Sequence, residues 1–448
     1  MKILVLTGDR LGCFEVRVER PFKELKRFGV EMYHTPVFPS APGRPGPDFN
    51  TLVQMISEYD LCICQRINNY DLIKFVVDAA FIAGVSVLHE VDDDYIHLPE
   101  TNPCFYGTSL SDGLLDRARA AQIEGRMDDL KDIMPQLEAS RLAGLAGYKK
   151  ALSMFDGITV TTPELKSMLL PYNKEIKVLP NNMETCHFYK DLCVEESDST
   201  GRMVKKNMMG MHSVPSFYIE RDPNNNYEPI MENGQVKLHE CLKIGYAGTL
   251  SHREDWWTIH NVWNEIVSRH ALNHHFVYIG DPFFYHQQAS FTGQYDEKTN
   301  PEGDGRPNRR IHIEENTVSM YLLNLRVLSI FVAPLTPNIF NMSKSDLKAL
   351  EGASWGACPV LPDYITYSRN WVHGKTAMLY KNQKEFLEIM EYLIANPAAR
   401  ELIGRQARQY VHEERLEKHH AQERFDYYQS VIAKKKKFQP LIPNKRKQ

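Results

Sequence analysis

Short apolar runs alternate with amphipathic stretches over the first 185 residues. KILVLT (2–7), DLCICQR (60–66) and DGITV (156–160) have the length and composition of buried strands. ERPFKELKRFG (19–29) and YDLIKFVVDAAFIAG (70–84) have helical spacing, and the first stops at Gly29. This alternation predicts a doubly wound α/β domain with a parallel sheet over residues 1–185.

Two segments depart from this pattern. Residues 108–153 are long, charged and helical in spacing, which predicts an inserted helical pair within the first domain. Residues 186–241 are rich in Asn, Asp, Ser and Met and contain PNNNYEP, which predicts an irregular insertion between domains.

A second α/β pattern follows over residues 242–414. CLKIGYAGT (241–249), HHFVYIGDP (274–282) and VLSIFVAPL (327–335) read as strands, and residues 283–312 read as a polar loop. A helix over 415–436 is long enough to cross back onto the first domain, and a basic tail over 437–448 ends the chain. Because open α/β sheets bind ligands at the carboxyl ends of their strands, we expect a site in a cleft between two facing domains.

Composition narrows the functional class. The 448 residues carry a formal net charge of −4, so no overall field attracts nucleic acid or an anionic membrane. The lysine-rich tail is typical of a solvated end, and contact with a polyanion stays open as its alternative. Eight cysteines without CxxC spacing predict free thiols in a reducing, cytoplasmic protein. No run reaches the roughly twenty apolar residues of a membrane span.

The stretch NMSKSDLKALEGASWGACPVL (341–361) predicts an anion site. Ser343 as N-cap, with Asp346 three residues later, predicts a capping box and a helix over 344–355. On such a helix Lys344, Lys348 and Glu351 share one face. A helix N-terminus with two added lysines would bind a diphosphate, and Glu351 would accept hydrogen bonds from ribose or sugar hydroxyls. A solvated face with a Lys–Glu pair is the alternative.

This stretch, together with IGYAGTLSHRED (244–255) and LTGDRLGCFEVRVERP (6–21), resembles the retaining GT-B glycosyltransferases of the glycosyltransferase family 4-like, group 1 type. The resemblance covers most of residues 1–185 and 242–433. It implies two Rossmann-like domains facing across a cleft, with a C-terminal helix crossing back. The family's paired glutamates match only in part, since Glu351 is the second and Ser343 stands where the first is expected.

The resemblance also implies roles for single residues. Gly12, Gly248 and Thr249 would let the backbone approach the donor, and Arg253 would pair with the diphosphate. A fixed cation there stabilises the charge on a departing nucleoside diphosphate. Arg253, Lys344 and Glu351 are the expected catalytic residues, and Ser343, Ser345 and Lys348 complete the expected donor site.

LHEVDDDYIHLPETNP (88–103) places Asp92, Asp93 and Asp94 at the end of a strand, where we expect them on the sugar and acceptor side. A solvated acidic loop is the alternative. His89 is expected near the donor sugar, and a core histidine is equally compatible with the sequence. No metal site or cofactor is expected, because basic residues and a helix end take the metal's place in this fold.

The resulting expectation is a retaining transfer of sugar from a nucleoside-diphosphate sugar, with a UDP-sugar favoured, to a hydroxyl acceptor, without a protein nucleophile. The acceptor stays open between saccharide, lipid-linked and protein. Phage-type glycosylation of hydroxymethylated pyrimidines in DNA is one alternative, motivated by the basic tail and GDGRPNRRIH (303–312). A non-catalytic sugar-binding scaffold, suggested by the missing first glutamate, and a nucleotide-sugar epimerase are the others.

Overall fold

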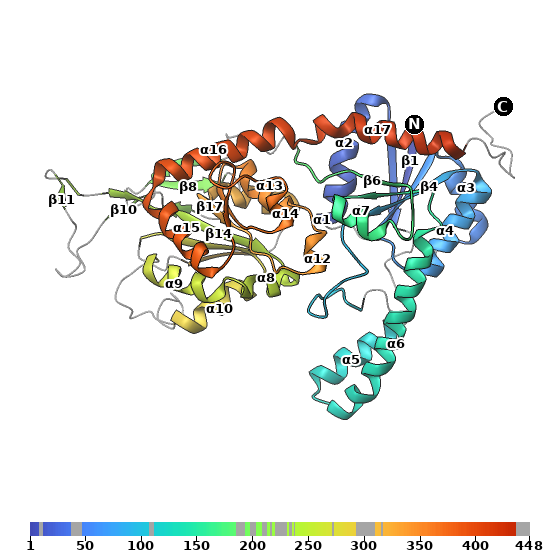
Figure 1. Ribbon diagram of the computed structural model, residues 1–448, viewed down its shortest axis with the longest axis horizontal. Helices are drawn as coiled ribbons and strands as arrows, with labels where there is room; N and C mark the ends of the chain where they lie inside the picture. Colours follow the sequence, from blue (N-terminus) through green and yellow to red (C-terminus); the bar gives the residue numbers. More distant parts are fainter. Residues whose placement is uncertain are drawn as a thin grey trace. The chain divides into compact units, whose positions relative to one another are not determined.

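Two parallel sheets of six strands each form the centres of two units of the chain (Figure 1). Unit 1 contains Met1–Asn181, Asn338–Ser345 and the part of the chain from Glu417, and unit 2 contains Asn182–Pro337 and Asp346–Leu416. The computed structural model describes residues 1–8, 12–36, 47–106, 112–184, 193–197, 203–207, 213–215, 217–219, 231–232, 235–236, 238–270, 273–292, 310–314 and 317–435. The basic tail lies outside these residues.

The sheet of unit 1 has the strand order β2-β1-β3-β4-β5-β6, and its paired strands are parallel. Its strands are β1 (Lys2–Thr7), β2 (Glu31–Pro36), β3 (Leu61–Gln65), β4 (Ser86–Val91), β5 (Gly157–Val160) and β6 (Ile176–Val178). β3 and β4 are buried along their whole length, as expected for parallel strands with helices on both faces. The direction of the strand order reverses between β1 and β3, which is where such sheets bind ligands.

Unit 1 also contains helices. They are α1 (Gly12–Phe14), the π-helical turn η1 (Glu15–Glu19), α2 (Arg20–Leu25), the 3₁₀ turn η2 (Lys26–Phe28), α3 (Phe49–Ser57), α4 (Tyr70–Ala83), α5 (Asp112–Ile123), α6 (Met127–Leu152), α7 (Pro163–Leu169), α12 (Ile339–Met342) and α17 (Glu417–Lys435). Asn69 caps α4 by accepting a hydrogen bond from Leu72 N, and Gly84, with φ of 68°, ends it. α6 extends beyond the sheet and carries α5 (Figure 1), and the two helices share a small apolar core of their own.

The crossing helix predicted near the C-terminus is α17, which packs on α2 and β4 within unit 1. A buried ion-pair network fixes it. Glu90 on β4 lies 2.6 Å from the Arg17 guanidinium and 3.8 Å from that of Arg424 on α17, and all three side chains are at most 2% exposed. Arg27 also donates a hydrogen bond to the Lys418 carbonyl. Because an unpaired buried charge is costly, each member of the network depends on the others.

The sheet of unit 2 has the parallel order β16-β15-β14-β17-β18-β19. Its strands are β14 (Lys243–Gly248), β15 (His275–Gly280), β16 (Arg310–Glu314), β17 (Ile330–Val332), β18 (Cys358–Pro362) and β19 (Met378–Tyr380). The two Rossmann-like sheets predicted from the sequence are thereby confirmed. β16 begins within the predicted loop 283–312, so that prediction is wrong for residues 310–312.

The helices of unit 2 are η5 (Leu250–His252), α8 (Arg253–Trp257), α9 (His260–His270), α10 (Phe283–Thr292), α11 (Val318–Asn324), η6 (Leu325–Val327), α13 (Leu347–Ser354), α14 (Ile365–Ser368), α15 (Gln383–Ala395) and α16 (Pro397–Glu414). α10 is a second departure from the predicted loop. No helix in the described part of the chain is long and apolar enough to cross a membrane.

The segment expected to be irregular contains short strands in its described parts. They are β7 (Cys193–Ser197), β8 (Met203–Asn207), β9 (Ser213–Pro215), β10 (Phe217–Ile219), β11 (Met231–Glu232), β12 (Gln235–Val236) and β13 (Leu238–Glu240). β7, β8 and β9 form an antiparallel sheet. The high content of turn-forming residues had favoured loop throughout this segment.

Candidate functional site

β14 ends at Gly248, a buried residue that two side chains approach closely. A Cβ at Gly248 would lie 2.5 Å from the Tyr246 hydroxyl oxygen and 3.1 Å from Lys348 Nζ. The end of β15 also approaches Gly248 closely. It does so at Gly280, which has a φ of 107° and where a Cβ would lie 2.4 Å from the Gly248 carbonyl oxygen. Thr249, which follows Gly248, is exposed. A side chain at position 248 would have to displace one of these groups.

Arg253 opens α8 with an exposed side chain, and its guanidinium carbon lies 4.7 Å from the centre of the Phe283 ring. The buried carboxylate of Asp255 fixes the turn that carries it. Asp255 accepts hydrogen bonds from His252 Nδ1 at 2.8 Å and from the backbone N–H of Thr336 at 2.8 Å. These two bonds fix the turn from which Arg253 extends, near the carboxyl end of β14.

The helix predicted over residues 344–355 is shorter in the structure. α13 begins at Leu347, and its N-cap residue Asp346 makes no side-chain capping bond. Asp346 instead accepts hydrogen bonds from Arg415 at 2.8 and 2.9 Å and from Trp371 Nε1 at 3.0 Å. Burial alone would raise the pKa of Asp346, but the pairing with Arg415 holds it below its usual value. The predicted capping box with Ser343 is therefore wrong.

Ser343, Lys344 and Ser345 follow α12 and belong to unit 1. Ser343 is fully buried, and its Oγ donates to the Phe340 carbonyl at 2.8 Å. Asn181 donates a hydrogen bond to Ser345 Oγ at 2.8 Å. Lys344 is partly buried, with Nζ 4.7 Å from the centre of the Phe340 ring. The two serines are thus placed by bonds within unit 1.

Lys348 and Glu351 lie about one turn apart on α13, while Lys344 is not on this helix, so the predicted face of three charges is wrong. Lys348 Nζ donates to the Ala247 carbonyl at 2.8 Å, which places its ammonium beside the Gly248 turn. Glu351 is 6% exposed, and its Oε2 accepts a hydrogen bond from the Tyr321 hydroxyl at 3.0 Å. Unit 2 therefore contains the Gly248 turn, the ammonium of Lys348 beside it and a Glu351 carboxylate held in one orientation.

In unit 1, the three aspartates after β4 have different surroundings. Asp94 is fully buried and accepts hydrogen bonds from His97, at 2.6 Å from Nδ1 and 3.3 Å from the backbone N–H. These bonds shape the turn, so Asp94 has a structural position. Asp92 is 9% exposed, and its Oδ2 lies 3.6 Å from Arg66 Nη1.

Asp93 has a raised pKa. Burial is the largest cause and the negative charge of Asp92 adds to it, while Lys344 and Arg66 act in the opposite direction. Asp93 is thus a carboxyl group whose charge depends on two neighbouring cations. Within the described ranges, no group of three or more His, Cys, Asp and Glu side chains could hold a metal ion.

Arg66 stands at the end of β3 in an unusual backbone conformation. Its φ is 54°, and no other non-glycine residue in the described part of the chain has a positive φ. Gly8 packs closely against this residue, since a Cβ at Gly8 would lie 2.4 Å from the Arg66 carbonyl oxygen. The guanidinium donates to the Tyr95 hydroxyl at 2.7 Å and to the thiol of Cys13, which follows Gly12 in α1. Strain of this kind is concentrated at functional sites.

His89 lies in the core of unit 1 and is 0% exposed. Its Nδ1 is 3.0 Å from the Cys64 carbonyl oxygen, and its Nε2 is 3.2 Å from the Tyr148 hydroxyl. The ring stacks on Phe155 at 4.6 Å. Burial lowers the pKa of His89 to about 4, so the ring is neutral at pH 7. This placement agrees with the core alternative.

Comparison with known proteins places these two units in a fold family. Residues 270–429 match the family model described as glycosyl transferase-like, and no curated protein matches the chain in sequence. Anabaena Alr3699/HepE in complex with UDP-glucose is 12% identical with a TM-score of 0.54, covering 98% of this chain and 100% of that one. Sucrose-phosphate synthase from Thermosynechococcus elongatus is 13% identical with a TM-score of 0.55, covering 97% and 100%. An alpha-glucosyltransferase in complex with UDP-glucose and DNA containing an abasic site is 10% identical with a TM-score of 0.53, covering 96% and 99%.

The chain has the GT-B fold. The segment 270–429, which matches the glycosyl transferase-like model, includes α13 and therefore Lys348 and Glu351. The turn of Gly248 and Arg253 precedes the matched segment and belongs to the same unit.

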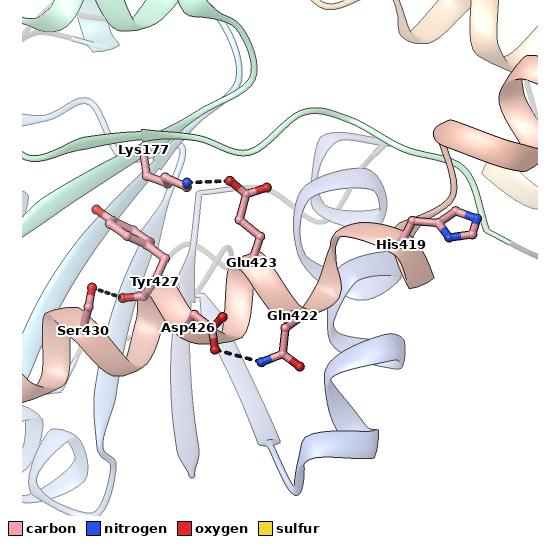
Figure 2. Close-up of a pocket in the computed structure, with 7 residues that line it drawn as sticks. All are labelled: Lys177, His419, Gln422, Glu423, Asp426, Tyr427 and Ser430. Atoms are coloured by element: carbon pink, nitrogen blue, oxygen red, sulfur yellow. Dashed lines mark hydrogen bonds and ion pairs between the residues drawn. The ribbon is translucent and has the colours of Figure 1, made fainter.

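A hollow of about 620 Å³ lies elsewhere on this GT-B chain, on the surface of α17 beside β6 (Figure 2). It is lined by Lys177, His419, Gln422, Glu423, Asp426, Tyr427 and Ser430. Lys177 and Glu423 pair across it at 2.5 Å. None of the candidate residues lines this hollow, and its lysine is already paired with Glu423, so we do not assign the site to it.

Sequence reasoning missed Arg66, Asp255 and Tyr321. Each acts through a partner far along the chain, since Tyr321 and Glu351 are 30 residues apart and Asp255 and Thr336 are 81 apart. No local spacing signals such pairs. For Arg66, the sequence indicates only its position at the end of the predicted strand DLCICQR.

Proposed function

We propose that this protein is a retaining glycosyltransferase that moves a sugar from a nucleoside-diphosphate sugar, with a UDP-sugar favoured, to a hydroxyl acceptor. One observation carries the proposal: the Lys348 ammonium is held beside Gly248, where a Cβ would lie 3.1 Å from it, at the carboxyl edge of the second sheet. Backbone N–H groups and a fixed cation at such an edge suit a diphosphate. The UDP and UDP-glucose complexes of the structural neighbours favour uridine as the base.

The donor would be held by unit 2. Arg253 and Lys348 would stabilise the negative charge that develops on the diphosphate as the bond to the sugar breaks. The backbone at Gly248 and Thr249 would approach the phosphates, and Glu351 would accept hydrogen bonds from ribose hydroxyls. These roles follow the resemblance, and the contacts of Lys348 and Glu351 are compatible with them.

Ser343, Lys344 and Ser345 precede α13, and their surroundings change the donor roles expected for them. Ser343 is buried and Ser345 is engaged by Asn181, so we no longer propose either as a donor contact. A diphosphate role for Lys344 now rests on its charge alone, because it does not lie on α13.

The acceptor side would lie in unit 1. We propose that Asp92 and Asp93 line it and that His89 and Asp94 have structural roles. Retention through same-face attack, in which the leaving phosphate takes the acceptor's proton, follows from the resemblance and needs no protein nucleophile. A cytoplasmic location stays a prediction.

The experiment is a thermal-shift panel with UDP, GDP, ADP and dTDP on the full chain and on Arg253→Ala. A ligand that binds only the native state raises the melting temperature. Stabilisation by one nucleotide, lost in Arg253→Ala and kept in the exposed helix control Arg405→Ala, supports the proposal. No shift with any nucleotide overturns it. Release of UDP from UDP-glucose then separates an enzyme from a non-catalytic scaffold.

A DNA acceptor is a second candidate, favoured by the structural neighbour bound to UDP-glucose and abasic DNA. The basic tail that motivates it lies outside the described residues. Arg310, from the GDGRPNRRIH stretch, is 6% exposed on β16 with its guanidinium over the Tyr285 ring at 5.3 Å, which removes one of the expected surface charges. Binding to duplex DNA that weakens steeply with salt would support this candidate, and absent or salt-insensitive binding would exclude it.

A further inference from the structure

The carboxylate of Glu351, which is proposed to bind the ribose, is hydrogen-bonded to a side chain from another helix of unit 2. Tyr321 on α11 donates its hydroxyl hydrogen to Glu351 Oε2 on α13 at a distance of 3.0 Å. The bond is directional, because a phenol has one hydrogen and an ionised carboxylate only accepts. It therefore fixes the position of the Glu351 carboxylate through one of its two oxygens.

Both helices are held firmly behind this bond. A Cβ at Gly352, the residue after Glu351, would lie 2.4 Å from Phe331 on β17, so α13 packs directly on the sheet. Thr317 caps α11 by accepting a hydrogen bond from the backbone N–H of Met320. A carboxylate anchored in this way loses little additional freedom when a ligand binds.

We propose that Tyr321 is a positioning residue: it holds Glu351 so that the carboxylate accepts hydrogen bonds from ribose hydroxyls, and the site thereby selects ribonucleotides over deoxyribonucleotides. This inference rests on the donor site of the proposed function and adds a residue and a specificity to it. Rejection of the deoxy ligand has a physical cause. A nearly buried carboxylate that is oriented toward a ribose hydroxyl loses that hydrogen bond when the hydroxyl is missing.

A purely structural bond between α11 and α13 is the competing explanation, and it predicts a different pattern. Loss of a structural bond lowers stability and weakens all nucleotides alike. Loss of a positioning bond weakens UDP while leaving the affinity for the deoxy ligand nearly unchanged, so the ratio of the two affinities falls.

The experiment measures dissociation constants by calorimetry for UDP, 2′-deoxy-UDP and 3′-deoxy-UDP. The proteins are the full-length wild type, Tyr321→Phe, Glu351→Gln and the double variant, with Tyr392→Phe as the control because Tyr392 is an exposed tyrosine on α15 of the same unit. We expect Tyr321→Phe to weaken UDP about three- to tenfold, the cost of ordering one flexible side chain, and to weaken at least one deoxy ligand much less. In the Glu351→Gln background the same substitution should have little further effect.

The possible results distinguish failure of the Tyr321 inference from failure of the proposed donor site. An unchanged affinity for UDP in Tyr321→Phe, or an equal loss for UDP and both deoxy ligands, overturns the inference and leaves the donor site intact. Absence of UDP binding by the wild type overturns the proposed uridine donor site and the inference with it. A melting temperature close to that of the wild type shows that Tyr321→Phe is folded.

Discussion

Arg415 donates hydrogen bonds to both carboxylate oxygens of Asp346, from Nη1 at 2.8 Å and from Nη2 at 2.9 Å. Asp346 is the residue at which the chain re-enters unit 2, and Arg415 lies next to the last residue of that unit, Leu416. Arg415 Nε also approaches Asn182 Oδ1 at 3.4 Å, where unit 2 begins. One guanidinium therefore joins three chain ends within unit 2.

Removing the charge of Asp346 should destabilise the protein strongly. In Asp346→Asn, the Arg415 guanidinium stays buried at 9% exposure without its counter-charge. Breaking one partner of a buried pair costs about 3 to 5 kcal/mol, which urea unfolding would detect. Glu388→Gln in the exposed pair with Lys384 is the matched control and should change the unfolding free energy by less than about 1 kcal/mol. Equal, small effects of both substitutions would show that the Asp346–Arg415 pair contributes little to the free energy of unfolding.

His89 should make the protein less stable at mildly acidic pH. Burial lowers its pKa from 6.5 to about 4, so the unfolded chain binds a proton in this window that the folded chain does not. Its contribution is fully present above pH 6.5 and is lost as the pH falls toward 4, by about 3 kcal/mol in total.

The test compares urea unfolding at pH 7.5 and 4.5 in the wild type and in His89→Gln, which keeps a donor and an acceptor but does not titrate. The wild type should lose about 2 to 3 kcal/mol more than the variant between the two pH values. The same loss in both would show that the histidine is not the cause.

The sequence predicted both sheets because buried parallel strands are continuous apolar runs, as in Leu61–Gln65 and Ser86–Val91. It failed where a long-range partner overrode a local signal. Ser343 and Asp346 have capping-box spacing, yet the Asp346 carboxylate is taken by an arginine 69 residues later. β16 was missed for a similar reason. A charged residue such as Arg310 favours a loop prediction, but in the structure Arg310 is buried beside an aromatic ring.

The charge of Arg66 should set the pH range in which Asp93 is ionised. Arg66 lowers the pKa of Asp93 against the effects of burial and Asp92, so Arg66→Met should raise that pKa. If turnover needs the ionised carboxylate, the acidic limb of UDP release from UDP-glucose moves to higher pH in Arg66→Met. Arg66→Lys keeps the charge and should restore most of the profile. A parallel loss at every pH, with no shift of the limb, would assign Arg66 a structural role only.

Gly248→Ala should abolish most donor binding without unfolding the protein. The added methyl group would lie 2.5 Å from the Tyr246 hydroxyl oxygen and 3.1 Å from Lys348 Nζ, so the ammonium or the turn must move. We expect nucleotide affinity to fall about tenfold or more, which is the lower part of the usual cost of overpacking. Gly113→Ala on α5, with no atom within 4 Å of the new methyl group, is the control and should bind as the wild type does.

A second substitution tests the cause of that loss. Tyr246→Phe removes the hydroxyl oxygen that the methyl group would strike, so Gly248→Ala combined with Tyr246→Phe should recover part of the affinity. The recovery is a coupling between two residues in contact, which distant effects on stability would not produce. If the double variant binds no better than Gly248→Ala alone, the clash with Tyr246 is not what excludes the donor, and displacement of the Lys348 ammonium becomes the explanation to test with Lys348→Met.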